Sequence, residues 1–233
     1  MKNLNHKVAL LVAGLLIAGA AQATLIDRGG GLIYDDVLNI TWLQDANYAK
    51  TSGYDSDGRM TWAAANAWAA SLSYGGYSDW RLPTVNPVGA SFDSTLSYDG
   101  STDYGYGITS PHSELAYMFS VNLGNQGYCD LSGCPHQSSF RPFNAGPFTN
   151  LQTSFYWSGT ALALQPAVSA WTFDVGTGLQ FYAFQSIPFY AWAVRPGDVI
   201  AAVPEPASVM LMLVGLGLVG AAAPRRRRAL GAS

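Results

Sequence analysis

Two aspartates in a turn-rich stretch are the first residues of this sequence that could do chemistry. Residues 55–58 read Asp-Ser-Asp-Gly, which imitates the start of a calcium-binding loop with Asp55 and Asp57 as ligands. The bidentate glutamate that closes such a loop is missing, because Asn66 stands at position twelve counted from Asp55. We therefore favour an ordinary turn, with calcium as the alternative, and expect no other metal or cofactor.

The chain has only two cysteines, Cys129 and Cys134. In an oxidising compartment this spacing predicts a disulfide that pins one short loop. The alternative is a zinc site, but His136 would bring the ligands to three where a structural zinc site needs four.

Carboxylates and tyrosines are interspersed in a long central segment, residues 85–150, which is rich in Gly, Ser, Pro and Asp and shows little periodicity. Tyr98 and Tyr106 are part of this pattern. Four further residues are candidates for contact with sugars, through calcium or by aromatic stacking: Asp99, Asp103, Tyr104 and Glu114. We favour the alternative of a solvated surface loop, which the cysteine pair would keep ordered.

Candidates for catalysis are few. His112 and His136 are the histidines that follow residue 24, and neither lies in a nucleophile motif; Trp157-Ser158-Gly159 lacks the Gly-x-Ser-x-Gly elbow of hydrolases. Trp80-Arg81 and Arg195 could contact a ligand, but semi-buried arginines paired with aspartates usually organise loops. We expect no catalytic residue, and keep as the alternative a secreted enzyme that uses His112, His136 or Glu114.

The predicted elements that position these residues begin with a β-hairpin over 29–43, which has an Asp/Asn turn. Thr61 is the expected N-cap of a helix over 62–72, and Gly75 or Gly76 could provide its left-handed C-cap. The buried face of this helix is predicted from the i, i+3, i+7, i+10 spacing of Trp62, Ala65, Ala69 and Leu72.

Downstream of the long segment, in which a short helix is expected at 113–119, the pattern changes to alternation. Strands are predicted at 155–158, 170–175, 179–184 and 189–195, which together form an antiparallel meander.

Composition limits the partners of the region between the two chain ends. Residues 24–202 carry six basic and fourteen acidic side chains, a net charge of −8, so the basic footprint that nucleic acid requires is absent. The same residues hold all 7 Trp, 13 Tyr and 10 Phe, which favours short strands and ordered loops within one domain.

The first residues predict a secretory signal peptide over 1–23. Lys2, His6 and Lys7 precede thirteen apolar residues, 8–20, and a small-x-small site ends at Ala23. As a helix the apolar run rises only about 20 Å, short of the roughly 30 Å hydrocarbon core, so we favour cleavage by signal peptidase after Ala23 over a membrane anchor.

The C-terminal residues 203–233 have three parts in a fixed order. Val203, Pro204, Glu205 and Pro206 precede seventeen uncharged residues, 207–223, and four arginines follow: Arg225, Arg226, Arg227 and Arg228. The span is at the short limit for crossing a bilayer, and the arginines would stop it on the cytoplasmic side. Its Gly-x-Gly-x-x-Gly letters at 215–220 lack the flanking elements of a dinucleotide site.

This arrangement resembles the PEP-CTERM sorting signal, which implies recognition by an exosortase, a membrane transpeptidase that removes the hydrophobic tail. The alternative is an ordinary single-pass anchor, which would leave the Pro-Glu-Pro motif unexplained.

Between the two ends, the sequence resembles the Lcl C-terminal domain family of bacteria, long filed as a domain of unknown function. The segments that carry the resemblance are 41–49 (TWLQDANYA), 57–62 (DGRMTW), 75–84 (GGYSDWRLPT), 156–160 (YWSGT) and 190–198 (YAWAVRPGD). It implies an α+β fold related to C-type lectins and to formylglycine-generating enzymes, with an antiparallel sheet, one main helix, a long loop region, and both chain ends in the sheet. The chain departs from the enzyme group at Val85-Asn86-Pro87-Val88 and lacks its catalytic thiol.

We therefore expect a signal peptide (1–23), an Lcl C-terminal-like domain (24–202) and a PEP-CTERM signal (203–233). The chain is expected to reach the cell surface, outer envelope or extracellular matrix through an inner-membrane intermediate, with signal peptidase and exosortase as partners. The domain is expected to bind extracellular polysaccharide without catalysis. The alternatives are an enzyme that acts on polysaccharide and a purely structural matrix component.

Overall fold

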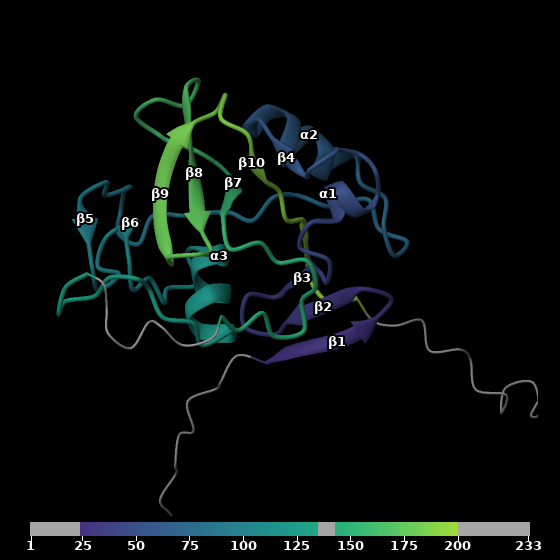
Figure 1. Ribbon diagram of the computed structural model, residues 1–233, viewed down its shortest axis with the longest axis horizontal. Helices are drawn as coiled ribbons and strands as arrows, with labels where there is room; N and C mark the ends of the chain where they lie inside the picture. Colours follow the sequence, from purple (N-terminus) through teal and green to yellow (C-terminus); the bar gives the residue numbers. More distant parts are fainter. Residues whose placement is uncertain (1–23, 135–142, 200–233) are drawn as a thin grey trace, which may run out of the picture.

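The computed structural model describes residues 24–134 and 143–199. They form two β-sheets with a few short helices (Figure 1). The predicted signal peptide, the C-terminal signal and His136 lie outside these residues. In the part of the chain that is described, no helix is long and apolar enough to cross a bilayer.

The smaller sheet joins the two ends of the domain. Its four antiparallel strands run in the order β1 (Leu25–Gly29), β2 (Leu32–Asp35), β3 (Ile40–Leu43) and β11 (Val194–Pro196). The hairpin predicted over 29–43 is confirmed as β2 and β3, and the Asp35 carboxylate holds its turn by accepting the N–H groups of Val37 (3.1 Å) and Leu38 (2.9 Å). The pairing of β11 with β3 confirms that the chain ends meet in one sheet.

The larger sheet has seven strands, in the order β4 (Arg59–Met60), β10 (Phe189–Tyr190), β7 (Phe155–Ala161), β8 (Ser169–Asp174), β9 (Leu179–Phe184), β6 (Tyr104–Gly105) and β5 (Leu96–Ser97). β7, β8 and β9 form the antiparallel meander that alternation predicted. However, β10 lies parallel to β7 and β5 parallel to β6, so the sheet is mixed and not antiparallel. The α+β class agrees with this structure, in which β-strands dominate.

The prediction of one strand over 189–195 is wrong. β10 and β11 belong to different sheets, and the chain crosses the core between them. In this crossing Trp192 is buried, and its indole N–H donates to the carbonyl of Leu43 at 2.7 Å. The predicted alternation is also absent here, because residues 191–195 are all buried, and no sequence pattern reports a change of hydrogen-bonding partner.

The main helix, α2 (Trp62–Ser71), begins where the sequence predicted. The Thr61 hydroxyl accepts the Ala64 N–H at 3.4 Å, and the helix buries Ala65, Trp68 and Ala69. The predicted glycine C-cap is wrong, because the helix ends in extended backbone at Leu72. Gly75 (φ +62°) and Gly76 (φ +85°) instead form a separate turn between Tyr74 and Tyr77, which suits their tolerance of positive φ.

Tryptophans dominate the core. Trp42, Trp68, Trp157, Trp171 and Trp192 are among its largest fully buried side chains. Two of them cross-link the elements, since Trp157 donates to Met60 O (2.9 Å) in the same way as Trp192 donates to Leu43 O. The core cluster includes residues of both sheets, among them Trp42 and Val194 of the smaller sheet and Trp157 and Phe173 of the larger one.

The long segment after residue 85 is tied to the sheets at several points. The short helix expected at 113–119 is present as α3 (Glu114–Tyr117), which continues as a π-helical turn, η1 (Met118–Asn122). The Val85 N–H donates to Thr160 Oγ1 (3.0 Å), and β5 and β6 extend the larger sheet. A further short helix, α1 (Tyr48–Thr51), lies near α2 on the other side of the molecule (Figure 1).

Candidate functional site

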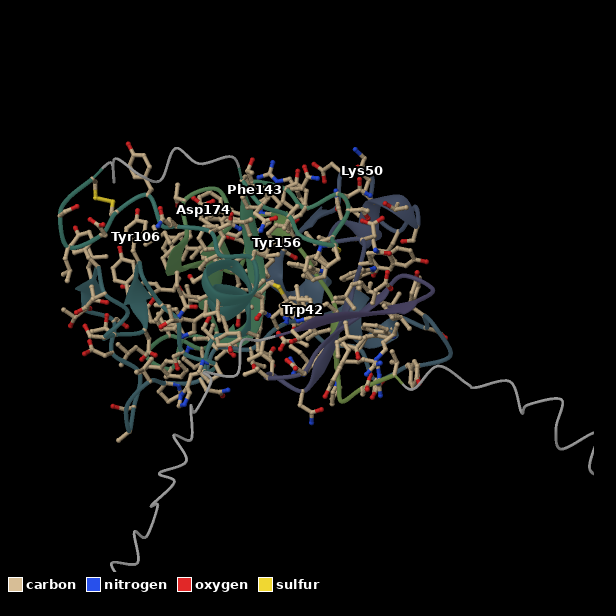
Figure 2. All side chains as sticks on the ribbon, turned by 90° about the horizontal axis from the view of Figure 1, so that it is seen from below. Trp42, Lys50, Tyr106, Phe143, Tyr156 and Asp174 are labelled. Atoms are coloured by element: carbon tan, nitrogen blue, oxygen red, sulfur yellow. A yellow bond between two sulfur atoms is a disulfide. The ribbon has the colours of Figure 1, made fainter. Side chains whose placement is uncertain are left out.

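A hollow of about 240 Å³ lies where the β5–β6 end of the larger sheet meets the disulfide loop. We call it the tyrosine hollow. Its lining residues come from two segments far apart in the sequence: Tyr98, Gly107, Thr109, Ser120, Asn125, Gln126, Gly127, Cys129 and Asp130. Figure 2 shows Tyr106 and the disulfide at this end of the molecule.

One wall of the tyrosine hollow is a stacked pair of rings. Tyr98 and Tyr106 are nearly parallel, with an interplanar angle of 3° and ring centroids 6.0 Å apart. Tyr98 remains 37% exposed, so a ring face is available to a ligand, whereas burial raises the pKa of the Tyr106 phenol above its ordinary value. The backbone beneath them is close-packed, because a Cβ at Gly107 (φ +71°) would stand 2.9 Å from the Tyr98 carbonyl oxygen.

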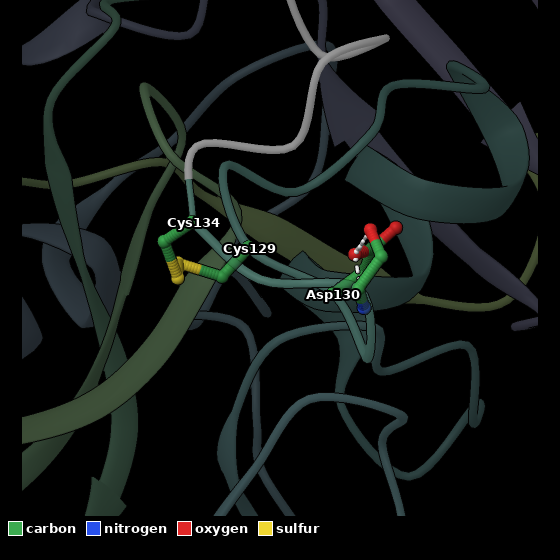
Figure 3. The surroundings of a disulfide bond; sticks show 4 residues. Cys129, Asp130 and Cys134 are labelled. Carbon is green, nitrogen blue, oxygen red and sulfur yellow. Dashed lines mark hydrogen bonds between the residues drawn. A yellow bond between two sulfur atoms is a disulfide. The ribbon is translucent and has the colours of Figure 1, made fainter.

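The opposite wall is the loop closed by the disulfide between Cys129 and Cys134 (Figure 3). Tyr128, which is 43% exposed, donates its backbone N–H to Thr177 O at 2.7 Å and thereby joins this loop to the larger sheet. Asp130 accepts both the N–H (2.8 Å) and the hydroxyl (2.5 Å) of Ser132. The wall is therefore braced by the sheet on one side and by the disulfide on the other.

The polar groups of the tyrosine hollow are mostly uncharged. Gln126 and Thr109 are exposed, and no side-chain hydrogen bond to another described residue occupies Gln126. Among the described lining residues, Asp130 carries the only formal charge. An aromatic face beside amide and hydroxyl groups suits the apolar face and hydroxyls of a sugar ring.

Two of the sugar-contact candidates are buried. The Asp103 carboxylate, 1% exposed, accepts the N–H groups of Val88 and Asp93, both at 2.8 Å. Glu114, 8% exposed, accepts Nη1 and Nη2 of Arg81, each at 2.7 Å, and the N–H of Thr84 at 2.7 Å. Both carboxylates therefore organise the central segment and do not form part of an exposed ligand surface.

The other two candidates lie outside the tyrosine hollow. Asp99 is exposed and accepts the Ser101 N–H at 3.1 Å. Tyr104 is half-buried, and its ring packs 5.8 Å from that of Tyr182 on β9. The structure thus does not bring the four candidates together.

The calcium candidates lie in a turn. Asp55 accepts the N–H groups of Asp57 (3.0 Å) and Gly58 (2.8 Å), and these bonds lower the pKa of Asp55 against the opposing effect of burial. Asp57 accepts the Arg59 N–H at 2.9 Å. Within the described residues no group of three or more His, Cys, Asp or Glu side chains could hold a metal ion.

The remaining polar candidates have internal partners. His112 Nδ1 lies 2.7 Å from the Pro87 carbonyl oxygen. Arg195 is bidentate to Asp79 (2.8 and 3.0 Å), and its guanidinium lies 4.0 Å from the centroid of the Tyr77 ring. Arg81 pairs with a glutamate and not, as expected, with an aspartate, but both arginines organise loops.

Half of the tyrosine hollow is not marked by the sequence pattern. Tyr98 belongs to the interspersed tyrosines of the central segment, whereas Gln126 and Asp130 belong to no motif. The signal that could have found them is the predicted disulfide loop, since such a loop presents its neighbouring side chains on a fixed backbone.

Comparisons with known proteins agree with both resemblances. The sequence profile described as the Lcl C-terminal domain matches residues 31–195, and the one described as the PEP-CTERM protein-sorting motif matches residues 202–228. No curated protein and no solved structure matches the chain. The sorting motif implies processing by an exosortase and delivery to the cell surface.

Proposed function

The chain belongs to the Lcl C-terminal domain family and carries a PEP-CTERM motif, and on this basis we propose that its domain binds extracellular polysaccharide at the cell surface or in the matrix, without catalysis. The proposal includes export by a signal peptide cleaved after Ala23, an inner-membrane intermediate, and a fold related to C-type lectins.

The tyrosine hollow is the observation that carries this proposal. Tyr98 lines the hollow and stacks on the Tyr106 ring, and Tyr128 lies beside the hollow, between its lining residues Gly127 and Cys129 on the disulfide loop; Tyr98 and Tyr128 are both exposed. Rigid aromatic side chains lose little conformational entropy when a ligand stacks on them. The nearby Gln126 and Thr109 supply uncharged donors and acceptors for sugar hydroxyls.

The absence of cationic side chains from its described lining favours a neutral sugar over an acidic one. Residues 24–202 as a whole are acidic, with a net charge of −8. A carboxylated or sulfated chain would therefore meet repulsion unless a divalent cation bridged the two.

The internal partners of the titratable groups support a role without catalysis. A general base must be able to reach substrate, but Glu114 is buried and held by both Nη1 and Nη2 of Arg81. The proposal of a non-catalytic module rests on this arrangement and on the departure from the enzyme pattern at Val85-Asn86-Pro87-Val88.

A glycan array and a matrix pull-down on residues 24–202, each with and without calcium, test the proposal. We expect binding to neutral glycans that Tyr98→Ala and Tyr128→Ala each weaken about tenfold, the effect of losing roughly 1.4 kcal/mol of stacking. Tyr54→Ala is the matched control, because Tyr54 is 56% exposed in the loop between α1 and β4. Empty arrays and pull-downs, or equal effects of all three substitutions, would overturn the proposal.

A further inference from the structure

Strand β9 has an open outer edge. On one side all six of its residues pair with β8, but on the other side only Gln180 pairs with another described residue, Gly105 of β6. Gln185 donates its N–H to Val168 O at 2.8 Å, next to β8. Because peptide groups alternate in direction along a strand, the peptide groups of Tyr182 and Phe184 point to the open edge.

Exposed apolar side chains surround this edge. Their exposed fractions run from 36% to 82%, and the set consists of Leu164, Val168, Tyr182, Phe184 and Ile187. Gln185 holds the loop between β7 and β8 against the end of β9, because its Nε2 donates to Pro166 O at 2.9 Å. The five side chains therefore belong to one surface, around the upper end of β9 in Figure 1.

The edge lacks the usual protection against pairing with another chain. Exposed edge strands are normally blunted by lysine, proline or a bulge, but residues 179–184 contain no charge and no proline. Asp174 is the only charged residue between positions 143 and 194, although the domain as a whole has a net charge of −8. Two copies of the chain can meet here without placing like charges opposite each other. A partner with a charged surface, in contrast, would find no complementary charge on this edge.

We propose that the β9 edge is a dimerisation surface, on which β9 of a second copy pairs antiparallel with β9 of the first about a two-fold axis. Unpaired peptide groups can form hydrogen bonds with another strand, and two-fold symmetry allows the same edge of two copies to pair with each other.

The five side chains expose about 500 Å² per copy, if each fully exposed side chain offers roughly 200 Å². The total of about 1,000 Å² reaches the size at which specific interfaces begin. This surface is separate from the tyrosine hollow, so it does not depend on sugar binding.

Sedimentation equilibrium of residues 24–202 tests the oligomeric state. We expect a dimer that Tyr182→Lys with Phe184→Lys weakens at least about tenfold, because antiparallel pairing through residues 182 and 184 places the lysine at 182 opposite the lysine at 184 of the other copy. Tyr54→Lys, on the α1 side of the molecule, is the control and should leave the dimer unchanged. Circular dichroism and thermal melting verify that each variant is folded.

Cysteine cross-linking locates the contact independently of stability. Tyr182→Cys combined with Phe184→Cys should form a disulfide-linked dimer in air, because position 182 faces position 184 of the other copy, whereas Tyr54→Cys should not. A wild-type protein that stays monomeric, an assembly larger than two, or a dimer that survives both lysines without cross-linking between positions 182 and 184 would each overturn the proposal.

Discussion

Replacement of Glu114 by glutamine tests how the central segment is held. The carboxylate accepts three donors at 2.7 Å, two from the Arg81 guanidinium and one from the Thr84 N–H. Nη1 and the Thr84 N–H share Oε2, so a carboxamide oxygen at that position keeps both of these bonds, but its N–H groups then face Nη2 and that bond is lost. The two retained bonds also lose the carboxylate charge, so the total loss is equivalent to about two charged hydrogen bonds.

The size of the effect follows from burial. A hydrogen bond to a charged group contributes about 1.5–3 kcal/mol, which gives roughly 3–6 kcal/mol for two bonds in a fully buried site. The Arg81 side chain is 34% exposed, so water can rehydrate the guanidinium and screen the charges. We therefore expect Glu114→Gln to lower the free energy of unfolding by about 2–3 kcal/mol, and the melting temperature by roughly 4–10 °C.

Urea unfolding of residues 24–202 measures this loss. Asp99→Asn is the matched control, since Asp99 is an exposed carboxylate of the same segment with a local partner, Ser101, and its substitution should change stability by less than about 0.5 kcal/mol. A double-mutant cycle with Arg81→Gln should give a coupling of at least about 1 kcal/mol. Equal stabilities of Glu114→Gln and Asp99→Asn would refute the role given to the ion pair.

Three further substitutions have expected outcomes. Burial raises the pKa of Asp35 above 3.8, so the folded protein binds a proton at this carboxyl at higher pH than the unfolded chain does. The contribution of Asp35 to the free energy of unfolding therefore increases as the pH falls toward 3.8. Urea unfolding at neutral and at mildly acidic pH should show this gain for the wild type and not for Asp35→Asn. Arg195 lowers the pKa of Asp79 below 3.8. The stability that the Asp79 carboxylate contributes is therefore fully present above pH 3.8 and is lost as the pH falls through the pKa of the folded state. Asp79→Asn should have a lower melting temperature than the wild type at neutral pH and the same melting temperature in strong acid. Gly58 has φ +82°, and a Cβ at this position would overlap Asn47 Oδ1. Gly58→Ala should therefore lower the free energy of unfolding, measured in urea, by about 2–4 kcal/mol. Adding Asn47→Ala should recover part of this loss, and the absence of any recovery would contradict the overlap.

The elements that the sequence predicted are those whose signals are local. Thr61 precedes an alanine-rich helix, and the meander strands are short apolar runs separated by turn residues, although β8 is buried at every position and does not alternate. The division at Trp192 could not be predicted, because a strand's partner is chosen by residues far away, here Leu43 and the rest of β3.

The same limit applied to the candidate sites. Asp103 and Glu114 lie in a polar, glycine-rich segment that resembles a solvated loop, yet both are buried. Their partners are distant in the sequence, since Arg81 precedes Glu114 by 33 residues and the Val88 N–H precedes Asp103 by 15. Burial of a carboxylate depends on such partners, which composition does not report.

The meeting of both chain ends in the smaller sheet has a mechanical consequence for a protein held by its C-terminal side. Arg28 next to the N-terminus binds Asp198 with Nε at 2.9 Å, and β11 lies along β3, so tension applied beyond Val199 would load this sheet first. β5 and β6, which carry the tyrosine hollow, lie at the far end of the molecule from this attachment (Figure 1). Tension applied along β3 and β11 would load their hydrogen bonds together in shear, because these bonds run across the strands.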